Sequence, residues 1–147
     1  MNPSTCFIDT SALFKRYIDE TGTDKMDSLF ESAALVIISI LTVVEFVSNL
    51  KRLADIEKVI DMEAYGAIRN EFFRDIASGR IQVEAVSANH IVTSVRLIDG
   101  KYVTPIDSLQ LAAVIGLKEI CENISFVCSD KKLCALAENE HINVVHI

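Results

Sequence analysis

Short apolar runs alternate along this chain with longer stretches in which apolar residues recur at helical spacing. The run Cys6-Phe7-Ile8 and the run from Leu35 to Ile38 contain no charged residue. Strands that are apolar throughout and separated by helices are typical of a parallel sheet covered by helices on both faces. The alternation therefore predicts a fold of the α/β class.

The same pattern places the individual elements. It predicts strands at residues 6–8, 35–38, 80–86, 125–128 and 143–146. It predicts helices around residues 13–18 and at 24–34, 40–53, 55–77, 87–98, from Pro105 onward, and at 130–138. Ser39 and Pro105 suit the starts of helices, and Gly79 suits the end of one. With only 2 Pro and 5 Gly in the chain, we expect short loops between these elements.

Length and hydropathy limit the class of protein. A chain of 147 residues is expected to form a single domain, residues 1–147. Its 50% of hydrophobic residues excludes a disordered chain. The longest stretch without a charge, residues 32–44, is too short for a membrane span of about 20 residues. Residues 1–9 are too short for a signal peptide, so we expect a soluble, cytoplasmic protein.

Charge and cysteine content argue against two kinds of site. The net charge of −7 disfavours a module that binds nucleic acid by charge alone, although nucleic acid met through metal ions stays possible. The four cysteines, at positions 6, 121, 128 and 134, contain no CxxC or CxxH spacing. We therefore expect neither a zinc site nor disulfides, and we interpret the cysteines as packing residues.

Three aspartates stand where a predicted strand ends or a predicted helix begins. Asp9 follows the first apolar run, Asp130 follows the fourth, and Asp107 lies in the first turn of the helix that starts at Pro105. Helix capping and the helix dipole explain each one singly. However, ligands of parallel sheets bind beyond the carboxyl ends of the strands, where Asp9 and Asp130 are expected.

Glu45 is harder to explain by capping, because it interrupts the apolar sequence from Val43 to Val47. Glutamate is rarely fully buried unless it is paired or ligates something. At helical spacing Glu45 shares one polar stripe with Thr42, Asn49 and Arg52. This stripe must face water, a partner or a site.

Four acids at the starts of four elements suggest one cluster. Carboxylates brought together raise one another's pKa, so such a cluster is costly without a cation. Oxygen ligands without Cys or His favour Mg²⁺ or Mn²⁺. A water bound to such an ion can attack phosphorus, which is the chemistry of metal-dependent phosphodiester hydrolysis.

Four motifs in order resemble those of PIN-domain proteins of the bacterial and archaeal VapC-like toxin type. The opening motif is matched by FIDTSALFKRY at residues 7–17 and the second by SILTVVEF at 39–46. The third is matched by PIDSLQLAA at 105–113 and the fourth by FVCSDKKL at 126–133. The resemblance spans nearly the whole chain.

This resemblance implies a three-layer α/β/α sandwich with a central, mostly parallel sheet. It implies a metal-dependent RNA endonuclease, the toxin of a toxin–antitoxin pair, with a cognate antitoxin as partner and a homodimeric assembly. Matched motif by motif, the catalytic and metal-binding set is Asp9, Glu45, Asp107 and Asp130. The cofactor implied is Mg²⁺ or Mn²⁺. The alternative is an inactive PIN-like scaffold that binds a protein partner or RNA.

Further residues have hypothetical roles around the acids. Ser11 and Ser129 are candidates for orienting the carboxylates, and Lys15, Arg16 and Arg52 are candidates for contacting the RNA backbone. A rival hypothesis is a phosphohydrolase with an aspartyl-phosphate intermediate. That chemistry commonly uses a second acid two residues after the first, and this chain has Thr and Ser after its first acid.

Overall fold

The computed structural model describes residues 4–33 and 35–147. In that part of the chain the elements are, in order, β1 (Thr5–Ile8), α1 (Thr10–Tyr17), α2 (Thr23–Ser32), β2 (Leu35–Ser39), α3 (Ile40–Asp55), α4 (Met62–Ala77), β3 (Ile81–Glu84), α5 (Ala88–Gly100), α6 (Pro105–Ile120), β4 (Ile124–Cys128), α7 (Lys131–Asn139) and β5 (Asn143–His146).

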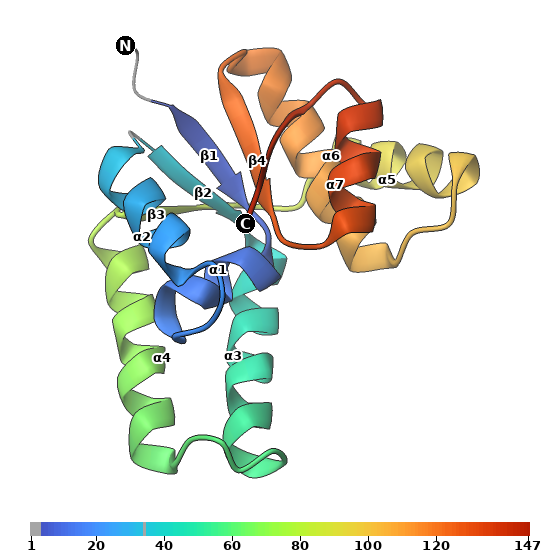
Figure 1. Cartoon of the computed structure of the whole chain (residues 1–147). Helices are drawn as coiled ribbons and strands as arrows, with labels where there is room; N and C mark the ends of the chain where they lie inside the picture. The colour runs from blue at the N-terminus through green and yellow to red at the C-terminus, as the bar shows by residue number, and fades with distance from the viewer. Residues whose placement is uncertain (1–3, 34) are drawn as a thin grey trace.

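The strands described form one parallel sheet in the order β3-β2-β1-β4-β5. Strand β1 lies at its centre, where Phe7 is in register with Ile37 of β2 and Phe126 of β4. Both of these neighbours come from segments distant in the sequence (Figure 1). The prediction of an α/β fold with a parallel sheet is confirmed.

Helices cover both faces of the sheet and make three layers. On one face, β1 directs Cys6 and Ile8 into a core shared with α1, α2, α3 and α4. On the other, Phe7 packs into a core with α5, α6 and α7. Alternating side chains of one strand thus enter opposite cores, as the two-residue period of a strand requires. The predicted α/β/α sandwich is confirmed.

Some element boundaries differ from prediction. The helix predicted over residues 55–77 begins only at Met62, because Asp61 accepts a hydrogen bond from the backbone N–H of Ala64 at 2.7 Å and starts a new helix. The strand predicted over residues 80–86 is limited to β3. The helix predicted over residues 24–34 ends with α2 at Ser32, and Ala34 lies outside the described residues.

The cysteines described are free thiols, and three of them, Cys6, Cys128 and Cys134, are buried in the two cores. Among the helices described, none combines the length and the apolar character that crossing a bilayer requires.

Candidate functional site

Three neighbouring strands end at the same edge of the sheet, and chain segments that bear acids follow two of them directly. Asp9 follows β1, and its backbone N–H donates to the carbonyl of Val127 in β4 at 3.0 Å. Asp130 follows β4 by two residues and begins α7. On the other side of β1, strand β2 ends at Ser39, which caps α3, the helix that carries Glu45. The order β2-β1-β4 therefore gathers these segments at one edge.

Asp9 is the most buried acid of the set, with 5% of its surface exposed. Its Oδ1 accepts a hydrogen bond from the backbone N–H of Ala12 at 3.0 Å and caps α1. Its Oδ2 accepts from the hydroxyl of Ser11 at 2.9 Å and lies 3.7 Å from the thiol of Cys128. Burial raises the pKa of Asp9 to about 6, and the negative charge of Asp107 adds to the rise.

Ser11 and Ser129 form a hydrogen-bonded chain that ends on Asp9. The hydroxyl of Ser129 donates to Ser11 Oγ at 2.7 Å, and Ser11 donates to the carboxylate. The structure thus brings both predicted serines to the acid. This chain restricts the rotation of the carboxylate about its side-chain bonds.

A second network holds Glu45. Its Oε1 accepts from the hydroxyl of Thr10 at 2.7 Å and from Nε2 of Gln110 at 3.1 Å. Thr10 also lies 3.1 Å from the hydroxyl of Thr42, which is fully buried. Residues of α1, α3 and α6 therefore meet on one carboxylate oxygen, and neither bond uses Oε2. Through Thr10, which follows Asp9 in the chain, this network ties Glu45 to the start of α1.

Gln110 and Thr42 were not predicted as site residues. Gln110 is 2% exposed, and its Oε1 has no hydrogen-bond partner among the described residues. A buried amide in an apolar helix is costly unless it is bonded, so its position between Leu109 and Leu111 was a signal that sequence inspection could have used.

Asp107 and Asp130 complete the acidic edge. Asp107 lies in the first turn of α6, and burial raises its pKa, with a further rise from the charge of Asp130. Asp130 is exposed, and its Oδ1 accepts from the backbone N–H groups of Lys132 at 2.8 Å and Leu133 at 3.1 Å. Asp107 therefore repels Asp9 electrostatically on one side and Asp130 on the other.

The donor set fits a divalent cation in its chemistry. It consists of carboxylate oxygens, the ligands that Mg²⁺ and Mn²⁺ prefer, and the raised pKa of Asp9 and of Asp107 shows charge that a cation would offset. Within the described residues, however, no three His, Cys, Asp or Glu side chains already converge as a metal-binding group.

The predicted basic residues do not join the acids. Lys15 and Arg16 lie in the last turn of α1 and pair with Glu20 at 3.3 Å and Asp27 at 2.8 Å. Each contact holds its cation at the end of α1 that is remote from Asp9.

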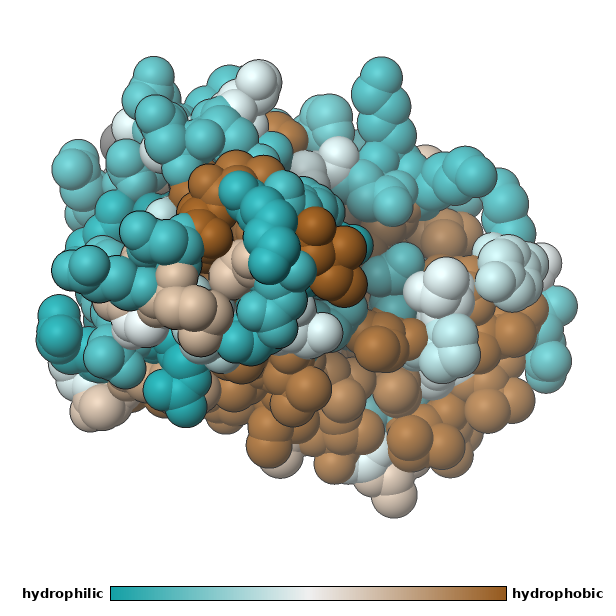
Figure 2. Space-filling model, turned by 90° about the horizontal axis from the view of Figure 1, so that it is seen from below, coloured by the Kyte–Doolittle hydropathy of each residue, from teal (hydrophilic) through white to brown (hydrophobic). Residues whose placement is uncertain are grey.

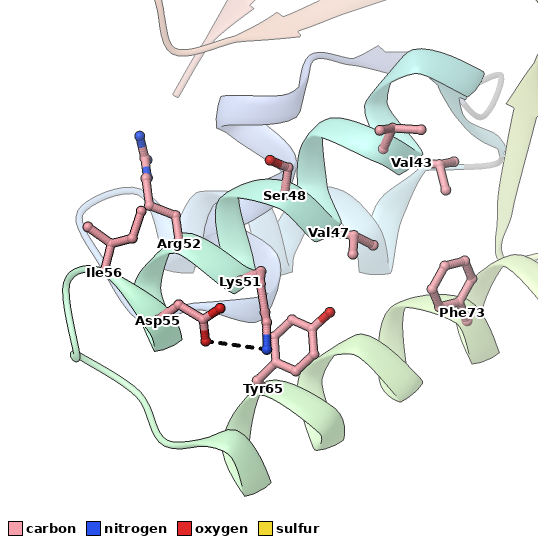
Figure 3. A pocket seen from close by; sticks show the side chains of 10 residues that line it. Val43, Val47, Ser48, Lys51, Arg52, Asp55, Ile56, Tyr65 and Phe73 are labelled. Carbon is pink, nitrogen blue, oxygen red and sulfur yellow. Dashed lines mark ion pairs between the residues drawn. The ribbon is translucent and has the colours of Figure 1, made fainter.

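Arg52 is two helical turns, about 10 Å, beyond Glu45 on α3 and pairs with Glu57 at 3.4 Å. It lines a groove between α3 and α4 whose walls are mainly apolar, including Val47, Tyr65 and Phe73 (Figure 3). Part of the predicted polar stripe therefore borders an apolar groove, while Glu45 bonds to Thr10 and Gln110.

The fold and the motifs together decide the family. The sequence matches the PIN domain family over residues 6–139. This chain belongs to the PIN-domain family. No curated protein is similar to it in sequence.

Solved PIN-domain structures share the whole architecture. FitAcB from Neisseria gonorrhoeae has a TM-score of 0.68 at 14% identity, and the match covers 96% of each chain. VapBC2 from Rickettsia felis, bound to a promoter DNA fragment, has a TM-score of 0.65 at 13% identity, covering 97% of this chain and 98% of that one. VapC20 from Mycobacterium tuberculosis, a sarcin–ricin loop cleaving toxin, has a TM-score of 0.64 at 17% identity, covering 88% and 93%. At these identities the likeness shows the shared fold.

Proposed function

We propose that this PIN domain is a metal-dependent endoribonuclease and the toxin of a toxin–antitoxin pair. The observation that carries the proposal is the acidic edge itself, where Asp9 at the carboxyl end of β1 and Asp107 in the first turn of α6 repel each other electrostatically. Such an arrangement costs stability, and a catalytic role explains why a fold would retain it. The RNA-cleaving activity of VapC20 on the same fold supports the substrate class.

The residues have separable tasks in this proposal. Asp9, Glu45 and Asp107 would hold Mg²⁺ or Mn²⁺, with Asp130 at the exposed end of the set. When bound, the ion supplies charge for the phosphate oxygens and lowers the pKa of a water molecule. Ser11 fixes the Oδ2 of Asp9, and Gln110 with Thr10 fixes the Oε1 of Glu45. Carboxylates held in this way lose little side-chain conformational freedom when a metal ion binds.

The test is cleavage of a mixed structured RNA with Mg²⁺, with Mn²⁺ and with EDTA. We expect the wild-type protein to cut only with a metal ion, and Asp107→Asn to reduce the rate by at least about 100-fold. Asp19→Asn is the matched control, because Asp19 is exposed and lies outside the acidic edge. Equal cutting by the wild-type protein and Asp107→Asn would contradict the assignment.

An inactive scaffold is the second candidate, and one observation favours it. Among the described side chains no metal-binding group of three is formed in advance. Binding of RNA or of a protein partner without cleavage at any metal concentration would support the scaffold and exclude the nuclease.

Two partner proposals accompany the nuclease. An antitoxin is proposed because solved relatives include toxin–antitoxin complexes. The apolar groove between α3 and α4 is suited to an amphipathic segment of such a protein.

A homodimer is proposed from the exposed apolar residues of α5. Ile91, Val92 and Val95 are 49%, 71% and 54% exposed and share one face of that helix. Apolar side chains gather over part of the molecule when it is seen from below (Figure 2). Exposed apolar surface of this kind marks subunit contacts.

A further inference from the structure

We propose that a cavity beside Asp107 and Asp130 is the subsite for one unpaired nucleotide of the RNA, with Tyr102 as the stacking platform for its base. The inference rests on the proposed nuclease function and specifies the form of RNA that the site accepts. It assigns substrate binding to residues 101–104 and to the first turn of α7, which have no role in the acidic edge itself.

The cavity adjoins the acidic edge directly. Asp107 of α6 and Asp130 at the start of α7 are both part of its wall, and its volume is about 610 Å³. Cavities of about 300–1,000 Å³ accept small organic ligands, a range that includes a nucleotide. A nucleotide placed there has its phosphate next to the acids.

Tyr102 is the aromatic residue in this wall, and 81% of its surface is exposed. In the described part of the chain, every other Phe and Tyr is buried or half-buried. A ring this accessible offers an open face for stacking, and an unpaired RNA base has a face that could cover it. Base–aromatic stacking is the usual way in which proteins hold unpaired bases.

Positive charge gathers around the same cavity in a chain whose net charge is −7. Lys101, Lys131 and Lys132 line it, and all three are exposed. Among the described residues, the ion pairs of the protein involve other cations, so these three lysines are free to meet phosphate. They would offset the repulsion between RNA and the two aspartates.

The floor of the cavity is apolar. Val103 and Leu133 are 8% and 2% exposed, and Leu136 is half-buried. A base can contact this floor only after it leaves its stack, which favours single-stranded RNA over a duplex. The apolar floor and the ring of Tyr102 can contact the base of one nucleotide, and the lysines at the rim can contact its phosphates.

The first experiment measures binding of a fluorescent single-stranded RNA of mixed sequence by anisotropy, in EDTA so that no metal-dependent cutting occurs. We expect Tyr102→Ala to weaken binding by about fivefold or more, and Tyr102→Phe to stay within about twofold of the wild-type protein, because Phe keeps the stacking face. Ile120→Ala is the control, since Ile120 is 87% exposed at the other end of α6. The same RNA annealed to its complement should bind more weakly and should not distinguish the variants.

A second measurement tests the lysines. We expect Lys132→Ala to lower the slope of log affinity against log salt by about 0.7, the value for one phosphate contact on a single strand. Lys25→Ala, an exposed lysine on α2, should leave the slope unchanged. With Mg²⁺ present, Tyr102→Ala should raise KM for RNA cleavage much more than it lowers kcat, because Tyr102 holds substrate and does not act at the phosphate.

The outcomes separate the two proposals. If the wild-type protein cuts RNA while Tyr102→Ala binds and cuts as well as Ile120→Ala does, the subsite is overturned and the nuclease stands. If the wild-type protein neither binds nor cuts any RNA, both proposals fall. Equal loss with single-stranded and duplex RNA would also overturn the subsite.

Discussion

Asp9 combines a structural and a chemical role on one side chain. One oxygen caps α1, while the other is held by Ser11 beside a buried thiol. The cap stabilises the helix, and the burial of the charge destabilises the fold. The pKa of Asp9 is raised because the effect of burial exceeds that of the hydrogen bonds to the carboxylate.

This balance makes the stability of the metal-free protein depend on pH. The pKa of Asp9 rises from an ordinary 3.8 to about 6 on folding, so the folded state binds the proton more tightly. The stabilisation by this proton is complete below about pH 4 and is lost as pH rises through 6. Asp9→Asn removes the charge, and we expect it to raise the free energy of unfolding at pH 8 by about 1–3 kcal/mol.

Urea denaturation in EDTA at several pH values between 4 and 8 measures this effect. The difference between Asp9→Asn and the wild-type protein should shrink as pH falls toward 4. Asp19→Asn, which removes an exposed charge, serves as the control. A difference that does not change with pH would show that burial of Asp9 does not set its pKa.

At the scale of residues, the sequence indicated the acids and the two serines beside Asp9, but not the residues that hold Glu45. The aspartates could be predicted as a group because strand ends and helix starts have recognisable patterns. The bonding partners of Gln110 and Thr42 could not be predicted, because an amide or hydroxyl in a helix has no periodicity that shows which neighbour it bonds. Those bonds cross from α6 and α3 to α1 and exist only after the elements are packed.

At the scale of elements, aromatic packing joins the helices that position Glu45. The ring of Phe46 lies 5.3 Å from that of Phe14, 5.2 Å from that of Tyr17 and 4.2 Å from that of Phe72. One side chain next to Glu45 therefore links α1, α3 and α4.

Phe46→Ala should remove this link. Because Phe46 is fully buried, we expect the free energy of unfolding to fall by about 3–5 kcal/mol. Phe73→Ala, in the half-buried ring that follows Phe72, should cost clearly less. Chemical denaturation of both variants checks the prediction, and equal losses would mean that the three helices are not held together at Phe46.

The division between α3 and α4 shows why element boundaries were harder to predict than elements. Residues 55–77 keep a helical pattern almost throughout, so periodicity alone gives one helix. The structure instead reverses the chain after Asp55, because α4 packs beside α3 over the same sheet face (Figure 1). The signal that separates the helices is the N-cap at Asp61. A single residue of this kind is not visible when hydrophobic periodicity is judged over a window of many residues.

At the scale of the whole molecule, apolar runs between helices were enough to predict a parallel sheet, whereas strand order was not. Apolar runs carry no information about which strand lies beside which. The observed order places β1 between β2 and β4, and only this order puts Asp9 beside the segments that carry Glu45 and Asp130. Helices on both faces followed from the same alternation, and the resemblance to the PIN family implied the same three layers.

The proposed dimer is a property of the whole molecule and can be tested through α5. We expect the wild-type protein to sediment as a dimer and Val92→Lys to sediment as a monomer at the same concentration, because a charge on the apolar face must lose its water in the interface. Val59→Lys is the control, since Val59 is 68% exposed in the loop between α3 and α4. A Val92→Lys protein that stays dimeric would place the interface elsewhere.

The central position of β1 also has a consequence during synthesis. Asp9 leaves the ribosome before its neighbour β4 and the acid Asp130, which follow about 120 residues later. At about 5–20 residues per second, that interval lasts roughly 6–24 seconds. A growing chain therefore holds Asp9 without β4, which completes its surroundings, and a chain that terminates before β4 never acquires the site. The complete acidic edge therefore forms only after β4 and Asp130 have been synthesised.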